Sequence, residues 1–284
     1  MTDINKIKKW IDEADAIIIG AGAGLSDAAG IHYSGEKFEE DFKDFIKKYG
    51  FKDLYTSSFY QFKTEEERWA YWAKHIYFSY YERKNTDLYR KLYNIVKDKN
   101  YFVITTNTDG QFINNGFKKN KIFEVQGSYS KLQCITPCHN KLYDNEKTIK
   151  KLLQNIDENL KVSSSLVPKC PVCHENMSVN LRCDDTFVED NHWHKMEKDY
   201  NDFILNSSDK KVLLLEFGVG FNTPSIIRFP FEEMTFMHDN FRLIRFNDNY
   251  SLVPNEIKAK SISVSDSISE VIDLLEKLCR GKNE

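Results

Sequence analysis

The sequence predicts an α/β fold, in which an open, mostly parallel sheet carries helices on both faces and a smaller domain is inserted. Residues 16–19, Ala-Ile-Ile-Ile, form a short apolar run of the kind that a parallel sheet buries on both faces. A glycine-rich turn, residues 20–26, follows at once. Further β-branched or aromatic runs recur at spacings long enough for crossover helices, which is typical of such a sheet.

The individual elements follow from hydrophobic periodicity. Apolar residues at helical spacing predict an amphipathic helix over residues 3–14 and a closing helix over residues 268–278. A strand that runs into a glycine turn is how a dinucleotide-binding unit opens, so the sheet is expected to be Rossmann-like. Besides the first strand, strands are expected at residues 101–105, 121–125, 212–217, 241–246 and 261–264.

Two stretches interrupt this pattern and are expected to form the inserted domain. Residues 36–99 are rich in aromatic side chains at a helical period and predict a helical module. Residues 129–180 contain four cysteines and predict a zinc-ribbon-like module. The Rossmann-like domain is therefore expected to comprise residues 1–35, 100–128 and 181–284.

The composition excludes several classes of protein. The chain of 284 residues has 40 Lys and Arg against 43 Asp and Glu, a net charge of -3 that argues against a nucleic-acid binder. Its hydrophobic content of 41% suffices for a large core. No apolar run approaches the roughly 18 residues of a membrane span, and the charged start lacks the apolar stretch of a secretory signal. We therefore expect a soluble, cytoplasmic protein.

The glycine turn is the first candidate binding element. Gly20, Gly22 and Gly24 would let the backbone approach a pyrophosphate, whose charge the amides at the following helix start favour. Their spacing differs from the ordinary Gly-x-Gly-x-x-Gly fingerprint. A tight connection between strand and helix is the alternative explanation.

Four of the six cysteines form two close pairs, Cys134 with Cys138 and Cys170 with Cys173. Four thiolates of this kind can bind zinc tetrahedrally, and the closed ligand set would make the ion structural. The first pair is one residue longer than the usual spacing, and leftover cysteines of a decayed site are the alternative. A disulfide scaffold is not expected in a chain of this length.

Five short motifs occur in a fixed order along almost the whole chain. The glycine turn continues into Gly30-Ile31, and the strand at 101–105 leads into Thr-Thr-Asn-Thr-Asp-Gly at 105–110. Glu-Val-Gln-Gly-Ser stands at residues 124–128, Gly-Val-Gly at 218–220, and Asn247 ends a strand. Together these motifs resemble those of the sirtuins, a family of NAD-consuming enzymes.

The resemblance implies three catalytic residues. Asn107 would hold the ribose hydroxyls of NAD or an ordered water, Asp109 would accept a hydrogen bond from the nicotinamide carboxamide, and Gln126 stands at the family's catalytic histidine. A helix N-cap with turn chemistry is the alternative for Asn107 and Asp109. The resemblance places NAD against Gly22, Ala23, Gly24, Ser26, Tyr33, Phe38, Asn107, Asp109, Gln126, Gly218, Val219, Gly220, Asn222 and Asn247.

Three departures from the deacylases of that family bear on the activity. Residues 32–35 read His-Tyr-Ser-Gly instead of Pro-Asp-Phe-Arg, Thr106 replaces a glutamine, and Gln126 replaces the histidine. A glutamine amide has no pKa near neutral pH, so it can orient a ribose hydroxyl but cannot exchange a proton with it. Deacylation is expected to be very slow or absent, while cleavage of the nicotinamide–ribose bond remains supported by Asn107 and Asp109.

These departures, with Gly-Val-Gly-Phe-Asn-Thr-Pro at residues 218–224, resemble the macrodomain-linked, class M sirtuins of microbes. That resemblance implies mono-ADP-ribosyl transfer from NAD to a lipoylated carrier protein of the glycine-cleavage type, reversed by a partner macrodomain hydrolase. The alternatives are a residual deacylase or lipoamidase that uses another base, such as His32, an NAD hydrolase, and a non-catalytic NAD sensor.

Overall fold

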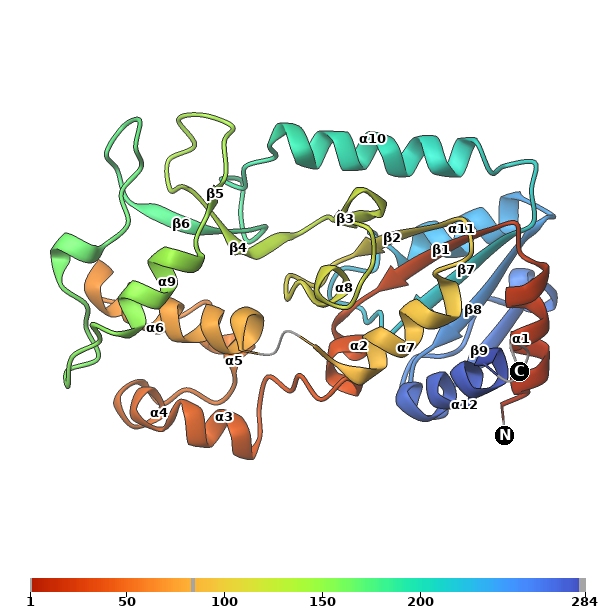
Figure 1. The fold of residues 1–284 in the computed structure, drawn as a ribbon, viewed down its shortest axis with the longest axis horizontal. Helices are drawn as coiled ribbons and strands as arrows, with labels where there is room; N and C mark the ends of the chain where they lie inside the picture. The colour runs from red at the N-terminus through yellow and green to blue at the C-terminus, as the bar shows by residue number, and fades with distance from the viewer. Residues whose placement is uncertain (1, 83–84, 281–284) are drawn as a thin grey trace. The chain divides into compact units, whose positions relative to one another are not determined.

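The computed structural model of the chain describes residues 2–82 and 85–280 (Figure 1). These residues form two compact units. The first, which we call the sheet unit, contains the described residues of 1–30, 85–126 and 192–284. The second, which we call the cysteine unit, contains those of 31–84 and 127–191.

The sheet unit is built on six parallel strands in the order β3-β2-β1-β7-β8-β9. Every residue of β1 is buried, as expected for a strand covered on both faces. The parallel sheet predicted from the sequence is confirmed. The strands are β1 (Ala16–Ala21), β2 (Tyr101–Thr105), β3 (Ile122–Glu124), β7 (Val212–Phe217), β8 (Phe241–Phe246) and β9 (Ser261–Val264).

Helices cover both faces of this sheet (Figure 1). Ile17 and Ile19 point into one core, shared with α1 (Ile4–Glu13), α7 (Asp87–Val96) and α12 (Ile268–Arg280). Ala16 and Ile18 alternate with them and point into a second core, with α10 (Asn191–Leu205) and α11 (Arg228–Met237). A second feature of the sheet is the reversal of its strand order between β1 and β7. In such sheets, ligands bind at the carboxyl ends of the strands beside the reversal. The short helices α2 (Ala23–Ala28) and α8 (Gln111–Asn114) begin at that edge, after β1 and β2.

The cysteine unit combines an antiparallel sheet, in the order β5-β4-β6, with short helices around an aromatic core. Phe42 lies at its centre, stacked on Phe38 and edge-on to Phe78. The strands are β4 (Gly127–Cys134), β5 (Tyr143–Asp144) and β6 (Met177–Leu181). The helices are α3 (Glu36–Asp41), α4 (Lys43–Tyr49), α5 (Leu54–Ser57), α6 (Glu65–Ile76), which continues as a π-helical turn (Tyr77–Tyr81), and α9 (Glu146–Leu153).

The unit boundaries differ from the expected ones at residues 31–35, which lie in the cysteine unit, and in two further places. Helix α7 lies in the sheet unit because its apolar face packs with α12, where Lys91 Nζ also lies 2.7 Å from Asp273 Oδ1. Residues 127–128 and 181–191 lie in the cysteine unit because β4 pairs with β6. The helical and cysteine modules share one core and form one unit, in agreement with the single inserted domain expected from the two stretches. Among residues 2–82 and 85–280, no helix has both the length and the apolar character to cross a bilayer.

A buried polar chain connects α6 to β4 inside the cysteine unit. His75 is fully buried, with Nδ1 2.8 Å from the Tyr71 hydroxyl and Nε2 3.1 Å from the Tyr129 hydroxyl. Burial lowers the pKa of His75 to about 3. The ring is therefore neutral at physiological pH and acts as a hydrogen-bonding connector.

We expect the stability of the protein to depend on pH through His75. The pKa of His75 is about 3 in the folded state and about 6.5 in the unfolded state. Between these two values the unfolded state therefore binds a proton that the folded state does not bind. The contribution of neutral His75 is full above pH ~6.5 and falls below it by at most about 1.4 kcal/mol per pH unit. His75→Gln should flatten this slope in urea unfolding measured between about pH 7.5 and 5. The half-exposed His194, changed to Gln, is the matched control, and equal slopes for wild type and His75→Gln would contradict the assignment.

Candidate active site

Two glycine turns meet at the carboxyl edge of β1 and β7. Gly22 N–H donates to Phe217 O at 2.9 Å, and Gly24 N–H donates to Gly218 O at 3.0 Å. A Cβ atom would lie 2.8 Å from Gly218 O if added to Gly22, and 2.7 Å from Gly218 Cα if added to Gly24. Gly218 itself has a φ of 59°. These glycines are thus required by the contact between the two turns, which supports the tight-connection explanation whether or not a phosphate also binds there.

A cluster of buried polar side chains lies directly below the first turn. Asn107 Nδ2 donates to Gly22 O at 3.0 Å and to Ser26 Oγ at 3.1 Å. Ser26 Oγ lies 2.5 Å from Asp109 Oδ2 and 3.1 Å from the hydroxyl of Tyr89. Since the serine has one proton, which the carboxylate accepts, Tyr89 donates to Ser26. The structure therefore joins three residues chosen from the sequence with Tyr89, a residue of α7 that no motif signalled.

Backbone geometry sets the direction of these side chains. Asn107 N–H donates to Thr105 Oγ1 at 3.0 Å, and Thr105 Oγ1 donates to Ala21 O at 3.1 Å, which ties the end of β2 to β1. Gly110 has a φ of 69° and is the N-cap residue of α8. Asp109 Oδ1 accepts from Gln111 N–H at 3.0 Å, so Asp109 has the turn role considered as its alternative.

Burial dominates the electrostatics of this cluster. Asp109 is 1% exposed, and burial raises the pKa of its carboxyl group, against the hydrogen bonds from Ser26 and Gln111. Burial also raises the pKa of the Tyr89 hydroxyl well above its usual value, and the charge of Asp109 adds to that effect. Tyr89 therefore remains a neutral donor beside the carboxylate.

The second turn is fixed by Asn247, which follows β8. Asn247 Nδ2 donates to Val219 O at 3.0 Å, and its Oδ1 accepts from the N–H groups of Asn249 at 3.1 Å and Tyr250 at 2.9 Å. One side chain therefore holds the 218–220 turn against the 247–250 segment. Asn222, two residues beyond that turn, is exposed.

The remaining residues chosen from the sequence lie elsewhere. Gln126 is partly buried, two residues after β3, where Trp193 Nε1 donates to the neighbouring Val125 O at 3.1 Å. Ala23 is exposed at the first position of α2. Tyr33 and Phe38 belong to the cysteine unit, and Phe38 stacks on Phe42 at 5.4 Å in its core. Their contacts with a cofactor, and that of Gln126, stay predictions.

The four cysteines chosen from the sequence come together in the cysteine unit. The Sγ atoms of Cys134, Cys138, Cys170 and Cys173 all lie within 4.8 Å of one another, with 3.5 Å between Cys134 and Cys173 and 3.7 Å between Cys138 and Cys170. Sulfurs bound tetrahedrally at about 2.3 Å from zinc stand about 3.8 Å apart, so the donor set fits that ion. His139 Nδ1 lies 2.9 Å from Cys138 Sγ, and its Nε2 lies 2.9 Å from the Tyr143 hydroxyl, so His139 could orient Cys138 from outside the cluster.

The order of motifs and the doubly wound sheet agree with a match to the Sir2 family domain over residues 22–209, more than half of the chain. The chain belongs to the Sir2 family. It is 36% identical over 267 residues to a "Protein ADP-ribosyltransferase" of Staphylococcus aureus, covering 94% of this chain and 84% of that protein. It is 30% identical to a "Probable bifunctional ADP-ribose hydrolase/ADP-ribosyltransferase" of Fusarium oxysporum, of which it covers 47%.

Solved Sir2 structures share the fold. A Sir2 homologue bound to NAD has a TM-score of 0.58 at 15% identity, covering 99% of this chain and 95% of that one. A mutant Sir2 homologue bound to ADP-ribose has a TM-score of 0.58 at 14% identity, covering 100% of this chain and 98% of that one. At such identities the likeness establishes the architecture alone.

Replacing Cys170 or Cys173 by Ser should remove a structural metal and lower thermal stability. A three-thiolate site binds zinc more weakly, and the binding free energy of such an ion is also folding free energy. Protein purified without chelator should contain about one zinc per chain by atomic absorption. Cys183→Ser, at an exposed cysteine outside the cluster, should keep both metal and melting temperature. Metal-free wild-type protein with normal stability would instead indicate a decayed site.

Proposed function

We propose that the protein is an NAD-dependent protein mono-ADP-ribosyltransferase. One observation carries the proposal: Asn107 and Asp109 are held in place below the glycine turn, while position 126, where the family's deacylases have a proton-accepting histidine, is a glutamine. A site that keeps groups for holding NAD but lacks the base of deacylation favours simple transfer of the ADP-ribosyl group. The name of the relative from Staphylococcus aureus supports this choice.

The overall reaction balances without a redox step. NAD supplies the ADP-ribosyl group: the bond between nicotinamide and the ribose carbon breaks, neutral nicotinamide leaves with the electron pair, and the acceptor bonds to that carbon and loses a proton. The chain's part is positioning and charge stabilisation. In this proposal Asn107 and Gln126 orient the ribose hydroxyls, and Asp109 accepts an N–H of the nicotinamide carboxamide.

The identities of the acceptor and of the partner protein are two more specific proposals. The class M resemblance supports a lipoylated carrier protein as acceptor and a macrodomain hydrolase that removes the modification. The relative from Fusarium oxysporum combines hydrolase and transferase in its name, and this chain spans about half of its length, which supports a functional link between the two activities. Incubation with labelled NAD and cell lysate, with and without lipoylated carrier, tests the proposal. Label on the carrier supports it, whereas nicotinamide release without labelled protein would indicate an NAD hydrolase.

NAD should stabilise the folded protein. A ligand at a hundred times its dissociation constant raises the free energy of unfolding by about 2.7 kcal/mol when it binds only the folded state. Thermal unfolding with millimolar NAD should show a clear upward shift. Folded protein whose melting temperature does not respond would count against NAD as the substrate.

Asn107→Ala and Gln126→Ala should each reduce ADP-ribosyl transfer at least about tenfold, or about 1.4 kcal/mol of transition-state stabilisation. Asn107→Ala also removes hydrogen bonds to Gly22 and Ser26, so transfer must be measured below its melting temperature. The exposed Asn206 and Gln154, each changed to Ala, are matched controls and should keep full activity. Robust deacetylation of lysine peptides by the wild-type protein would overturn the mechanism, because a glutamine cannot exchange a proton with a ribose hydroxyl.

A further inference from the structure

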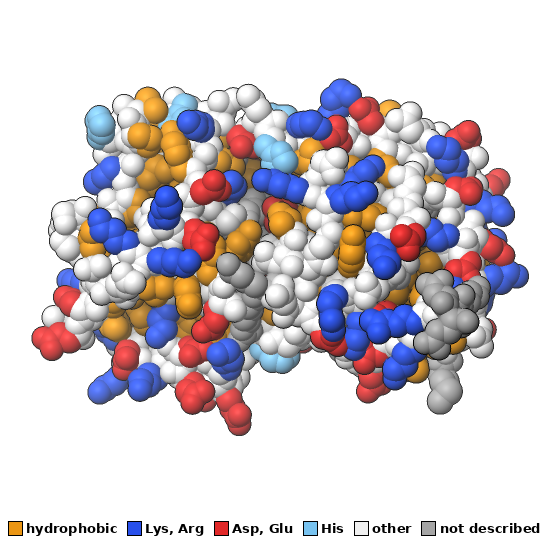
Figure 2. Space-filling model, in the orientation of Figure 1, with side chains coloured by type: hydrophobic (Ala, Val, Ile, Leu, Met, Phe, Trp, Pro, Cys, Tyr) orange, Lys and Arg blue, Asp and Glu red, His pale blue; other side chains and the backbone are white. Residues whose placement is uncertain are grey.

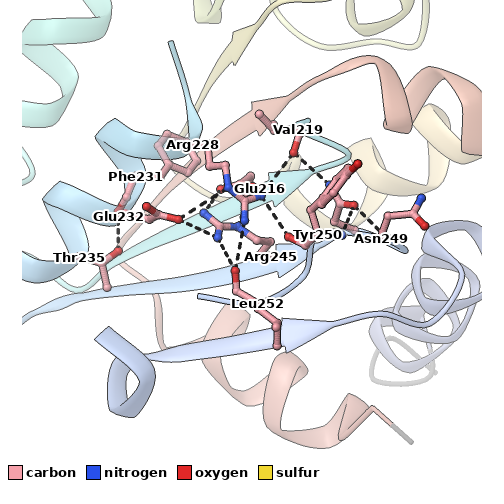
Figure 3. A network of polar contacts seen from close by, with 11 residues as sticks. Glu216, Val219, Arg228, Phe231, Glu232, Thr235, Arg245, Asn249, Tyr250 and Leu252 are labelled. Atoms are coloured by element: carbon pink, nitrogen blue, oxygen red, sulfur yellow. Dashed lines mark hydrogen bonds and ion pairs between the residues drawn. The ribbon is translucent and has the colours of Figure 1, made fainter. Parts of the chain in front are cut away.

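A charged network that no motif signalled lies inside the sheet unit, next to the second glycine turn (Figure 3). Glu216 on β7 and Arg245 on β8 are both fully buried. Arg245 holds the carboxylate with two hydrogen bonds, Nε to Oε1 at 2.8 Å and Nη2 to Oε2 at 2.9 Å. Its Nη1 lies 2.8 Å from Glu232 Oε1 and donates to Leu252 O at 2.8 Å.

Arg228, the first residue of α11, extends this network to the loop after β8. Its Nη1 donates to Tyr250 O at 3.0 Å and lies 3.7 Å from Glu216 Oε1, while Nη2 donates to Leu252 O at 3.2 Å. The planar fork of a guanidinium fits two such carbonyls at once, which a lysine ammonium cannot do in the same geometry. Arg228 therefore fixes the path of the backbone over residues 250–252.

The same side chain also touches the glycine turn. Arg228 Nη1 donates to Val219 O at 3.5 Å, the carbonyl that Asn247 Nδ2 also approaches. Gly218 O in turn accepts from Gly24 N–H. Polar contacts thus join the buried carboxylate of Glu216 to Val219 in the second glycine turn, and the neighbouring Gly218 of that turn joins it to the start of α2.

Burying Glu216, Arg228 and Arg245 in this way, with the partly buried Glu232 beside them, is not an efficient route to stability. Desolvation offsets much of the attraction within a buried ion pair, and well-packed apolar residues often stabilise a fold as well. What the network provides is a defined position for two backbone segments, because each guanidinium binds carbonyls as well as carboxylates. Such an arrangement suggests that the position of these segments matters for binding.

Each of the two segments presents an aromatic side chain to solvent. Phe221 is 54% exposed and Tyr250 is 50% exposed, and their rings meet edge to face with centroids 5.1 Å apart. The Cζ atom of Arg228 lies 4.6 Å from the centroid of the Phe221 ring, within the range of a cation–π contact. The aromatic pair therefore stands at the carboxyl edge of β7 and β8, and Arg228 contacts both of its members.

We propose that Arg228 is a positioning residue that holds Phe221 and Tyr250 as a stacking wall for the adenine ring of the dinucleotide. The proposal rests on the proposed function, which takes NAD as substrate. Asn107 and Asp109 follow β2 and are assigned to the nicotinamide end, so the β7–β8 side of the reversal point is left for the adenosine end. A purine offers a π-face to an exposed aromatic pair, and its binding would cover the pair's apolar surface.

Arg228→Met tests the positioning role. Methionine keeps an unbranched side chain but removes the fork, while Glu216 stays paired with Arg245. Arg242→Met is the matched control, because Arg242 on β8 also contacts a carboxylate, Glu13, and an aromatic ring, Trp10, in another part of the sheet unit. ADP-ribose affinity by calorimetry and the KM and kcat for NAD are measured well below both melting temperatures. We expect Arg228→Met to weaken ADP-ribose binding and raise KM about tenfold, with kcat within about twofold, and Arg242→Met to change neither.

Two surface variants keep the test independent of folding. Phe221→Ala and Tyr250→Ala alter exposed rings, and each should weaken the direct binding of both AMP and ADP-ribose while leaving the affinity for nicotinamide mononucleotide unchanged. Unchanged ADP-ribose affinity in these variants would overturn the stacking wall, and would point to a protein partner if they lost transfer to protein alone. Unchanged affinity in Arg228→Met, with only a lower melting temperature, would reduce the network to a structural role.

Failure of the proposed function has a different signature. If wild-type protein binds ADP-ribose but labels no acceptor, the transferase proposal fails, while the differences in affinity between variants still decide the role of Arg228. If wild-type protein binds neither ADP-ribose nor NAD at millimolar concentration, both proposals are overturned.

Discussion

The close approach of two glycine turns is the constraint on which the rest of the site depends. Gly22 and Gly24 after β1 meet Gly218 after β7 so tightly that a single Cβ atom would collide with backbone. This contact lies where the strand order reverses, and it joins two halves of the sheet that are far apart in sequence. On one side it carries the hydrogen-bonded cluster around Asn107 and Asp109, and on the other the charged network of Glu216 and Arg228. Neither arrangement could keep its geometry if the turns moved apart.

The sheet could be predicted from the sequence because its strands are short apolar runs and its crossovers have ordinary lengths. The bounds of β2, β7, β8 and β9 agree with the predicted ranges. Hydrophobic period does not tell which core a helix joins, so α7 was assigned to the helical insertion although its apolar face packs on the sheet. For the same reason the contact of Tyr89 on α7 with Ser26, 63 residues earlier in the chain, could not be predicted from the sequence.

The charged network also could not be predicted from the sequence, for a different reason. Glu216 stands in the run Val-Leu-Leu-Leu-Glu-Phe and gives no indication of its partner, because Arg245 lies 29 positions away on the neighbouring strand. The register of β7 against β8 pairs Glu216 directly with Arg245, and that register exists only once the sheet has formed. The cysteine cluster is the opposite case. Its pair spacing is a local property that already restricts the geometry, which is why the four cysteines that come together could be named from the sequence.

The two buried carboxylates of the site are treated in different ways, and the difference bears on function. Burial raises the pKa of Glu216, while the positive charges of Arg245 and then Arg228 lower it. The charge of Glu216 is therefore compensated by these cations, and both of its oxygens accept hydrogen bonds from Arg245. Asp109 meets a hydroxyl and a backbone N–H, one on each oxygen. An ionised carboxylate offers about four acceptor positions, so roughly half of the capacity of Asp109 remains. A ligand amide could therefore be accepted without breaking either existing bond. Because Asp109 is 1% exposed, an amide that bound there, as proposed for nicotinamide, would require the atoms that cover the carboxylate to move aside.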